Sequence, residues 1–165
     1  NKFIESYSLA KLKSFNPNIF NCCDKHRMYI EIIQNTNKDI KEGAVFNETG
    51  IIGQVVNNKS FYEVMLLTDT KSSIPLTNSK GDFYCNASGS GTSDYITCSY
   101  SQLVWLDNHE LGEKFFSSGL GGIYPKGIEI GNLESIKIVD TSTTLLTIKL
   151  ISNPLHSNLF GVIKL

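Results

Sequence analysis

Residues 114–139 read KFFSSGLGGIYPKGIEIGNLESIKIV, and this stretch decides the fold. Short runs rich in Phe and Ile flank a corner that contains four glycines and one proline. Such runs, bounded by Gly, Ser and Pro, predict strands joined by sharp turns. Glycine suits corners of a barrel because it tolerates positive φ and bulges where a Cβ would clash. The glycines that we assign to corners are Gly50, Gly53, Gly119, Gly121, Gly122 and Gly127.

The same pattern extends through everything after Pro17. Segments rich in Ile, Val, Thr, Phe and Tyr are bounded by Asn, Gly, Ser and Asp. No helix-period segment of ten or more residues separates them, which argues against alternating strand–helix units. The expected strands are 28–33, 44–46, 51–56, 62–68, 74–77, 82–86, 95–100, 103–106, 114–116, 128–130, 133–139, 144–151 and 160–165. This number of short strands predicts an all-β protein with two antiparallel β-barrels of about six strands each.

The first residues follow a different pattern. Residues 1–14 contain no Gly or Pro, and five apolar residues fall near helical spacing. These residues are Phe3, Ile4, Tyr7, Ala10 and Leu12. Pro17 disfavours helical geometry at the residue before it, so it ends the segment. We therefore expect a short N-terminal helix within residues 1–18.

The charge balance limits the classes of partner. The chain of 165 residues has 15 Lys and Arg against 16 Asp and Glu, which gives a formal net charge of −1. Nucleic acid is excluded as the main partner, because binding phosphates needs a concentrated cationic surface. No apolar run approaches the roughly 20 residues that a membrane helix needs. Because the sequence begins at Asn1, we expect an excised ectodomain whose membrane anchor lies upstream.

Three motifs resemble segments of a known family, the rod shape-determining protein MreC. Residues 49–56 (TGIIGQVV) are similar to its G-[LI]-[VI]-G-x-V turn and strand, and residues 64–69 (VMLLTD) to its V-x-L-L-T-D segment. Residues 117–131 (SSGLGGIYPKGIEIG) resemble its T-S-G-L-G-G-[IV]-[FY]-P-x-G-[LI]-P-[VI]-G signature. The departures are Ser117 for Thr, Tyr124 for Phe and Glu129 for Pro. The motifs occur in the family's order, and the resemblance covers about residues 19–165.

The resemblance implies a non-enzymatic scaffold of bacterial cell elongation that organises lateral peptidoglycan synthesis and maintains rod shape. It implies a periplasmic location, with an anchor in the inner membrane in the full-length protein. The implied partners are an elongation-specific class B penicillin-binding protein, MreD and, through a cytoplasmic part, the actin-like MreB. No catalytic residues, cofactor or metal are expected.

Pattern and resemblance together predict the domain organisation. Residues 1–18 would form the end of a coiled coil, and its five apolar residues named above would mediate self-association. The first barrel would use residues 19–72 and 138–165. The second barrel, residues 73–137, would be inserted within it.

The expected function is binding, in which apolar residues at loops or edges are desolvated and a few aromatic anchors dominate the affinity. Our candidates for partner binding are Ile123, Tyr124 and Pro125, because a glycine-flanked turn would display them. Phe83 and Tyr84, at a predicted hairpin, are the second choice. The competing interpretation is that these residues pack inside a barrel.

A serine protease is the alternative enzyme class, because one barrel of the family resembles half of a chymotrypsin-like domain. A triad would need a Ser beside a His that a carboxylate orients. The candidates are His26, His109 or His156, with Asp69 or Asp94, and with Ser117 or Ser118. Neither a G-D-S-G-G segment nor a G-x-S-x-G elbow occurs, so we expect no protease.

A module that binds peptidoglycan or another glycan is the alternative binding class. Such a module would use exposed aromatic side chains for stacking. The candidates are Trp105 with Tyr100, or Phe83 with Tyr84, although buried aromatics are the commoner use.

The four cysteines leave two questions open. Cys22 and Cys23, which precede His26 by four and three residues, lack the second ligand pair of a zinc site, so we predict no metal there. Cys85 and Cys98 flank a turn rich in Gly and Ser. They would either form a disulfide across a hairpin, in an oxidising compartment, or stay buried thiols.

Overall fold

The computed structural model describes residues 7–16, 24–34, 40–59, 61–101 and 108–165. These ranges contain twelve strands and no helix, and accordingly no helix in them is able to cross a membrane. The strands are β1 (Ser8–Phe15), β2 (Arg27–Gln34), β3 (Ala44–Asn47), β4 (Gly50–Asn57), β5 (Tyr62–Leu66), β6 (Ser73–Asn78), β7 (Tyr84–Gly89), β8 (Tyr95–Ser101), β9 (Lys114–Ser117), β10 (Glu129–Ile138), β11 (Thr143–Leu150) and β12 (Leu159–Ile163).

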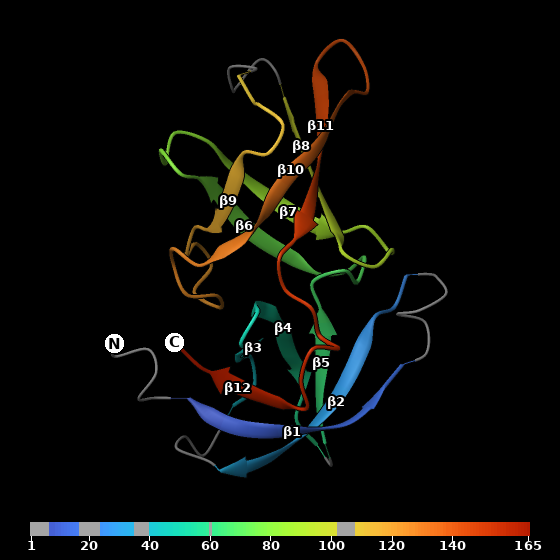
Figure 1. The fold of residues 1–165 in the computed structure, drawn as a ribbon, viewed down its shortest axis with the longest axis vertical. Helices are drawn as coiled ribbons and strands as arrows, with labels where there is room; N and C mark the ends of the chain where they lie inside the picture. Colours follow the sequence, from blue (N-terminus) through green and yellow to red (C-terminus); the bar gives the residue numbers. More distant parts are fainter. Residues whose placement is uncertain (1–6, 17–23, 35–39, 60, 102–107) are drawn as a thin grey trace.

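The strands close into two antiparallel β-barrels, which confirms the predicted pair of six-stranded barrels. The first barrel has the order β1-β12-β3-β4-β5-β2, and the second has the order β10-β11-β8-β7-β6-β9. Figure 1 shows the two barrels following one another along the long axis of the molecule, with the second barrel above the first. The chain leaves the first barrel after β5, completes the second, and returns to the first only for β12.

The N-terminal segment is a strand, so the predicted helix is wrong for residues 8–15. Ala10 is fully buried in the first barrel, whereas Lys11 and Lys13 lie outside and form ion pairs with Glu31 at 3.5 and 3.7 Å. The spacing of Ala10 and Leu12, two residues apart, suits a strand as well as it suits one face of a short helix. The segment forms a strand because it pairs with β12 on one side and with β2 on the other.

The residues assigned to a self-associating stalk therefore have other positions. Tyr7 packs edge-on against the ring of Phe46, with ring centroids 5.6 Å apart. Leu12 is partly buried against the core of the first barrel. Phe3 and Ile4 lie outside the described residues.

The boundary expected at residue 138 is also displaced. β11 pairs with β10 and with β8, so it belongs to the second barrel and not to the first. A tight turn fixes this pairing, because the amide of Val139 donates a hydrogen bond to the carbonyl of Thr143 at 2.9 Å. The second barrel thus runs from Ser73 to Leu150. Apolar and polar residues alternate along β11 in a way that is compatible with either barrel. The sequence pattern therefore did not show to which barrel this strand belongs.

The hydrophobic core continues from one barrel into the other. One cluster of buried side chains fills the first barrel, around Met28, Ile30 and Phe160. The other fills the second barrel and also includes Ile51 and Leu67, which belong to the first barrel and the connection that follows it. The barrels are therefore held together by apolar packing.

Candidate partner-binding surface

The glycine-rich corner between β9 and β10 is held together by hydrogen bonds to one buried serine, Ser117. The Ser117 hydroxyl donates a hydrogen bond to the carbonyl of Pro125 and accepts one from the amide of Ile128 at 3.0 Å. The Ser117 carbonyl accepts from the amide of Gly127 at 2.8 Å. Gly119 has a φ of +80°, and a Cβ there would stand 2.8 Å from the Cβ of Lys126. These contacts fix the corner as a rigid loop.

Tyr124 ties this corner to the first barrel. Its side chain is 2% exposed, and its hydroxyl donates a hydrogen bond to Oε1 of Gln54 in β4 at 3.2 Å. Burial raises the pKa of the Tyr124 hydroxyl well above its ordinary value. Tyr124 therefore connects the corner to the first barrel, and its buried ring is not available to a partner.

The corner displays a residue that the sequence reasoning missed. Leu120 is 58% exposed, although it lies within a loop whose base is hydrogen-bonded. Ile123 is partly exposed, whereas Pro125 is buried like Tyr124. Of the three residues expected to be displayed here, only Ile123 reaches the surface. A leucine between glycines of a turn was the available signal for Leu120.

The two aromatics of the second choice point in opposite directions. Phe83 is 3% exposed and packs edge-on against Tyr100, with ring centroids 5.1 Å apart. Tyr84, the next residue, is 41% exposed on the outside of β7. Phe83 and Tyr100 are thus removed from the surface candidates, and Tyr84 stays. Trp105 lies outside the described residues.

The candidate protease residues are not brought together. The ring of each histidine contacts a residue other than serine: His26 contacts Thr68 (2.7 Å), His109 contacts Glu113 (2.8 Å), and His156 contacts Glu48 (3.6 Å). Ser117 is engaged at the base of the corner, and the Ser118 hydroxyl accepts a hydrogen bond from the amide of Leu120 at 3.3 Å. Among the described residues, no Ser-His pair is in hydrogen-bond contact.

Asp69 has a structural partner instead of a catalytic one. Its side chain is 1% exposed, and Oδ2 accepts hydrogen bonds from the amide of His26 at 2.8 Å and from Nε of Arg27 at 2.9 Å. Oδ1 accepts from the amide of Lys71 at 2.9 Å. This buried ion pair fixes the connection between β5 and β6.

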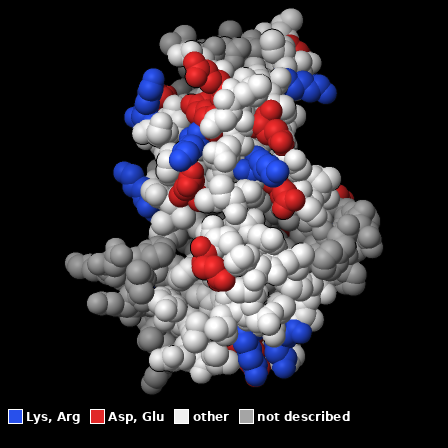
Figure 2. Space-filling model, viewed as in Figure 1, with Lys and Arg blue, Asp and Glu red and all other residues white. Residues whose placement is uncertain are grey.

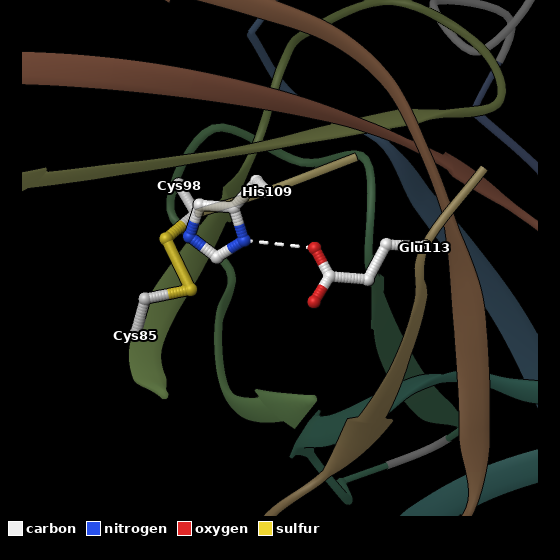
Figure 3. The surroundings of a disulfide bond; sticks show 4 residues. All are labelled: Cys85, Cys98, His109 and Glu113. Carbon is white, nitrogen blue, oxygen red and sulfur yellow. Dashed lines mark hydrogen bonds and ion pairs between the residues drawn. A yellow bond between two sulfur atoms is a disulfide. The ribbon is translucent and has the colours of Figure 1, made fainter. Parts of the chain in front are cut away.

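A disulfide lies inside the second barrel. Cys85 in β7 is bonded to Cys98 in β8, which answers the question that the sequence left open. Figure 3 shows the disulfide beside the imidazole of His109, whose Nδ1 faces Glu113. The ring of Phe83 packs against that imidazole with centroids 4.4 Å apart. The cluster is part of the barrel interior and not a surface site.

Metal binding finds no support in the ranges that the structure describes. No group of three or more His, Cys, Asp or Glu side chains is close enough there to hold an ion. Cys22 and Cys23 lie outside these ranges.

The charged side chains form no field of one sign on the visible face. Figure 2 shows Lys and Arg interspersed with Asp and Glu over the second barrel, while the described surface of the first barrel has few charges on this face.

Comparison with known sequences gives a consistent result. A family model described as "Rod shape-determining protein MreC, barrel core" matches residues 19–164. The cell shape-determining protein MreC of Haemophilus influenzae is 32% identical over 112 residues, which are 64% of this chain and 31% of that protein. The protein of that name from Escherichia coli is 27% identical over 117 residues, 70% and 31% respectively. The chain spans less than a third of the length of these curated relatives.

Solved structures share the fold. MreC from Pseudomonas aeruginosa superposes with a TM-score of 0.79 at 22% identity, covering 95% of this chain and 98% of that one. The major periplasmic domain of the cell shape-determining filament MreC gives 0.71 at 19% identity, with 94% and 93% covered. A complex between PBP2 and MreC from Helicobacter pylori gives 0.68 at 17% identity, with 94% and 96% covered.

Proposed function

The chain belongs to the MreC family of cell shape-determining proteins, which are not enzymes, and on this premise we propose that it is a scaffold of the bacterial elongation machinery. Its partner would be an elongation-specific class B penicillin-binding protein, whose recruitment organises lateral peptidoglycan synthesis. The observation that supports this most is the match of the barrel core over residues 19–164. The similar MreC of Helicobacter pylori was solved as a complex with PBP2.

We propose that the chain works in the periplasm. Similar structures are periplasmic domains of MreC. The disulfide between Cys85 and Cys98 supports this location, because disulfides persist in oxidising compartments such as the bacterial periplasm. MreD is a further proposed partner, and the contacts with the membrane and with MreB would be made by parts of the full-length protein outside these 165 residues.

Self-association is a further proposal, supported by the description of a similar MreC as a filament. Because β1 is built into the first barrel, this association would use barrel surfaces and not a helical stalk over residues 8–15. Light scattering over a range of concentrations tests it. A molar mass that stays at one chain per particle throughout would contradict it.

For the penicillin-binding protein we propose the corner between β9 and β10 as the docking surface. Leu120 would act as the apolar anchor, and Ile123 would lie beside it. A rigid loop suits this role because little conformational entropy is lost when it binds. A few well-packed residues near the centre generally carry most of the binding energy of such interfaces.

The test is a titration of the chain with the periplasmic domain of the class B penicillin-binding protein from the same organism. Saturable binding is expected, and Leu120→Ser should weaken it by about tenfold, which corresponds to about 1.4 kcal/mol. Leu111→Ser is the matched control, because Leu111 is 68% exposed in another turn of the same barrel. No saturable binding would refute the proposed partner, and an equal loss in both variants would refute the corner as the surface.

A further inference from the structure

A row of three side chains on the outside of the second barrel forms a trough. In the register of the sheet, Thr77 of β6 lies opposite Tyr84 of β7 on one side and Phe116 of β9 on the other. All three lie at outward positions, since their neighbours along each strand are more buried. Neighbouring strands are about 4.8 Å apart, so the two aromatic residues are separated by roughly 10 Å across the smaller threonine.

The trough is part of a groove of about 320 Å³, which we call the aromatic groove. It is lined by the side chains just named and by Lys80 and Lys126. This volume lies at the lower end of the range for clefts that hold small ligands, about 300–1,000 Å³. Tyr84 and Phe116 lie on either side of the smaller, polar Thr77. A ligand ring with an apolar face would fit between these two aromatic side chains.

The charge of the aromatic groove is positive. Its described lining includes two lysines and no carboxylate. Within the described part of the chain, no carboxylate oxygen lies within ion-pair distance of Lys80 or Lys126, whereas nearby Lys114 is paired with Glu129 at 3.5 Å. An occupant with a carboxylate would therefore find two cations that no described carboxylate neutralises.

Both lysines are carried by turns that are fixed from within. In the β6–β7 turn, Nδ2 of Asn78 donates to Oδ1 of Asp82 at 2.6 Å, and the amide of Asp82 donates to Oδ1 of Asn78 at 3.1 Å. Lys126 lies in the corner that Ser117 closes. The groove is therefore preorganised for binding.

The geometry selects among classes of occupant. At the floor of the groove, β6 is paired with β7 on one side and with β9 on the other, so its backbone is not available to an extended peptide by strand pairing. Two lysines are too few for nucleic acid, whose binding needs a concentrated cationic surface. A sugar ring has an apolar C–H face for stacking on an aromatic side chain and hydroxyl groups for polar contacts.

We propose that the aromatic groove binds a carboxylate-bearing sugar of a glycan strand. The sugar ring would lie against Tyr84 and Phe116, and its carboxylate would pair with Lys80 or Lys126. This inference goes beyond the scaffold role, because it adds direct contact with a polysaccharide. It does not depend on docking of the penicillin-binding protein at Leu120.

Calorimetric titration of the 165-residue chain with three probes tests the proposal. The probes are a tetrasaccharide of alternating N-acetylglucosamine and N-acetylmuramic acid, chitotetraose, which lacks the carboxylate, and a tetraglutamate peptide, which lacks the sugar. The expected result is saturable binding of the first probe, with affinity at least about fivefold above either of the others. Equal or stronger binding of chitotetraose or tetraglutamate would overturn the proposal, as would no saturable binding.

Variants locate the binding. Tyr84→Ala should weaken binding of the muramic acid probe by about five- to tenfold, whereas Tyr84→Phe, which keeps the ring, should retain it. Lys126→Gln should weaken binding of that probe and leave any chitotetraose binding unchanged. Phe61→Ala and Lys137→Gln are controls, because both residues are exposed and lie outside the groove. Equal losses in the control variants would overturn the assignment to this groove.

Discussion

At the scale of single residues, buried polar side chains fix the positions of the loops. Ser117 holds both ends of the corner through its hydroxyl, and Asp69 holds the connection between the barrels through Arg27 and two backbone amides. Both side chains are almost completely buried. A buried polar atom that loses its partner costs more than the lost hydrogen bond alone. These residues are therefore expected to act on stability and not on chemistry.

Replacement of Ser117 tests the first of these roles. Ser117→Ala should lower the free energy of unfolding by about 1–3 kcal/mol, because the buried carbonyl of Pro125 loses a donor and the amide of Ile128 loses an acceptor. Urea denaturation measures the change. Ser135→Ala, at an exposed position of β10, is the control and should change stability by less than about 0.5 kcal/mol. Equal stability of the two variants would show that the hydroxyl does not hold the corner.

Removal of Asp69 tests the second role. Asp69→Ala leaves Arg27 buried without its closest carboxylate, and the remaining contact with Glu63 is longer, at 3.8 Å. Breaking a buried ion pair from one side costs about 3–5 kcal/mol. Lys11→Gln breaks an exposed pair and should cost about 1 kcal/mol or less. If both variants unfold at the same urea concentration, the buried pair is not the determinant that we describe.

At the scale of elements, the sequence predicts the strands better than their assignment to barrels. Alternation and turn residues located most strands after Pro17, because each strand has one buried face. Whether β1 is helix or strand, and which barrel takes β11, depend on pairing with distant strands. Burial of Tyr124 similarly depends on Gln54, 70 residues away. Contacts of this kind leave no local signal in a single sequence.

The buried contact of Tyr124 with Gln54 of β4 predicts that stability depends on pH. Because burial raises the pKa of Tyr124 above its ordinary value of 10.0, the folded protein holds this proton more tightly than the unfolded chain does. The tighter binding of this proton contributes to the free energy of unfolding, and the contribution is fully present below pH 10. It is lost as the pH rises further, by up to about 1.4 kcal/mol per pH unit. Urea denaturation between pH 8 and 11 should therefore show a steeper loss for the native protein than for Tyr124→Phe. Parallel curves would contradict a buried hydroxyl.

The disulfide between β7 and β8 predicts a loss of stability on its removal. The two cysteines are 13 residues apart, and closing a loop of this size contributes about 3 kcal/mol in the chain-entropy model. The double variant Cys85→Ala, Cys98→Ala should be less stable by about 2–4 kcal/mol in urea. Alkylation and mass spectrometry of protein exported to the periplasm provide the direct check. Free thiols at both positions would contradict the bond.

At the scale of the whole molecule, two barrels are joined by a common apolar core. Among the described residues, the candidate Ser, His and Asp side chains are not assembled into a catalytic group, so the molecule offers surfaces for binding. The corner between β9 and β10 contacts both barrels, since it grows from the second and Tyr124 reaches the first. The family signature in residues 117–131 predicted the corner, but not that Leu120 would be its exposed residue. Exposure depends on which way a closed loop faces, and residue type alone does not specify that.

The central proposal is that this corner is the docking surface for a class B penicillin-binding protein. Backbone amide hydrogen exchange, measured on the chain with and without a saturating periplasmic domain of that protein, tests it most directly. We predict slower exchange in residues 117–128, and unchanged exchange in the turn that contains Leu111. Complex formation with protection elsewhere, and none in residues 117–128, would contradict the account.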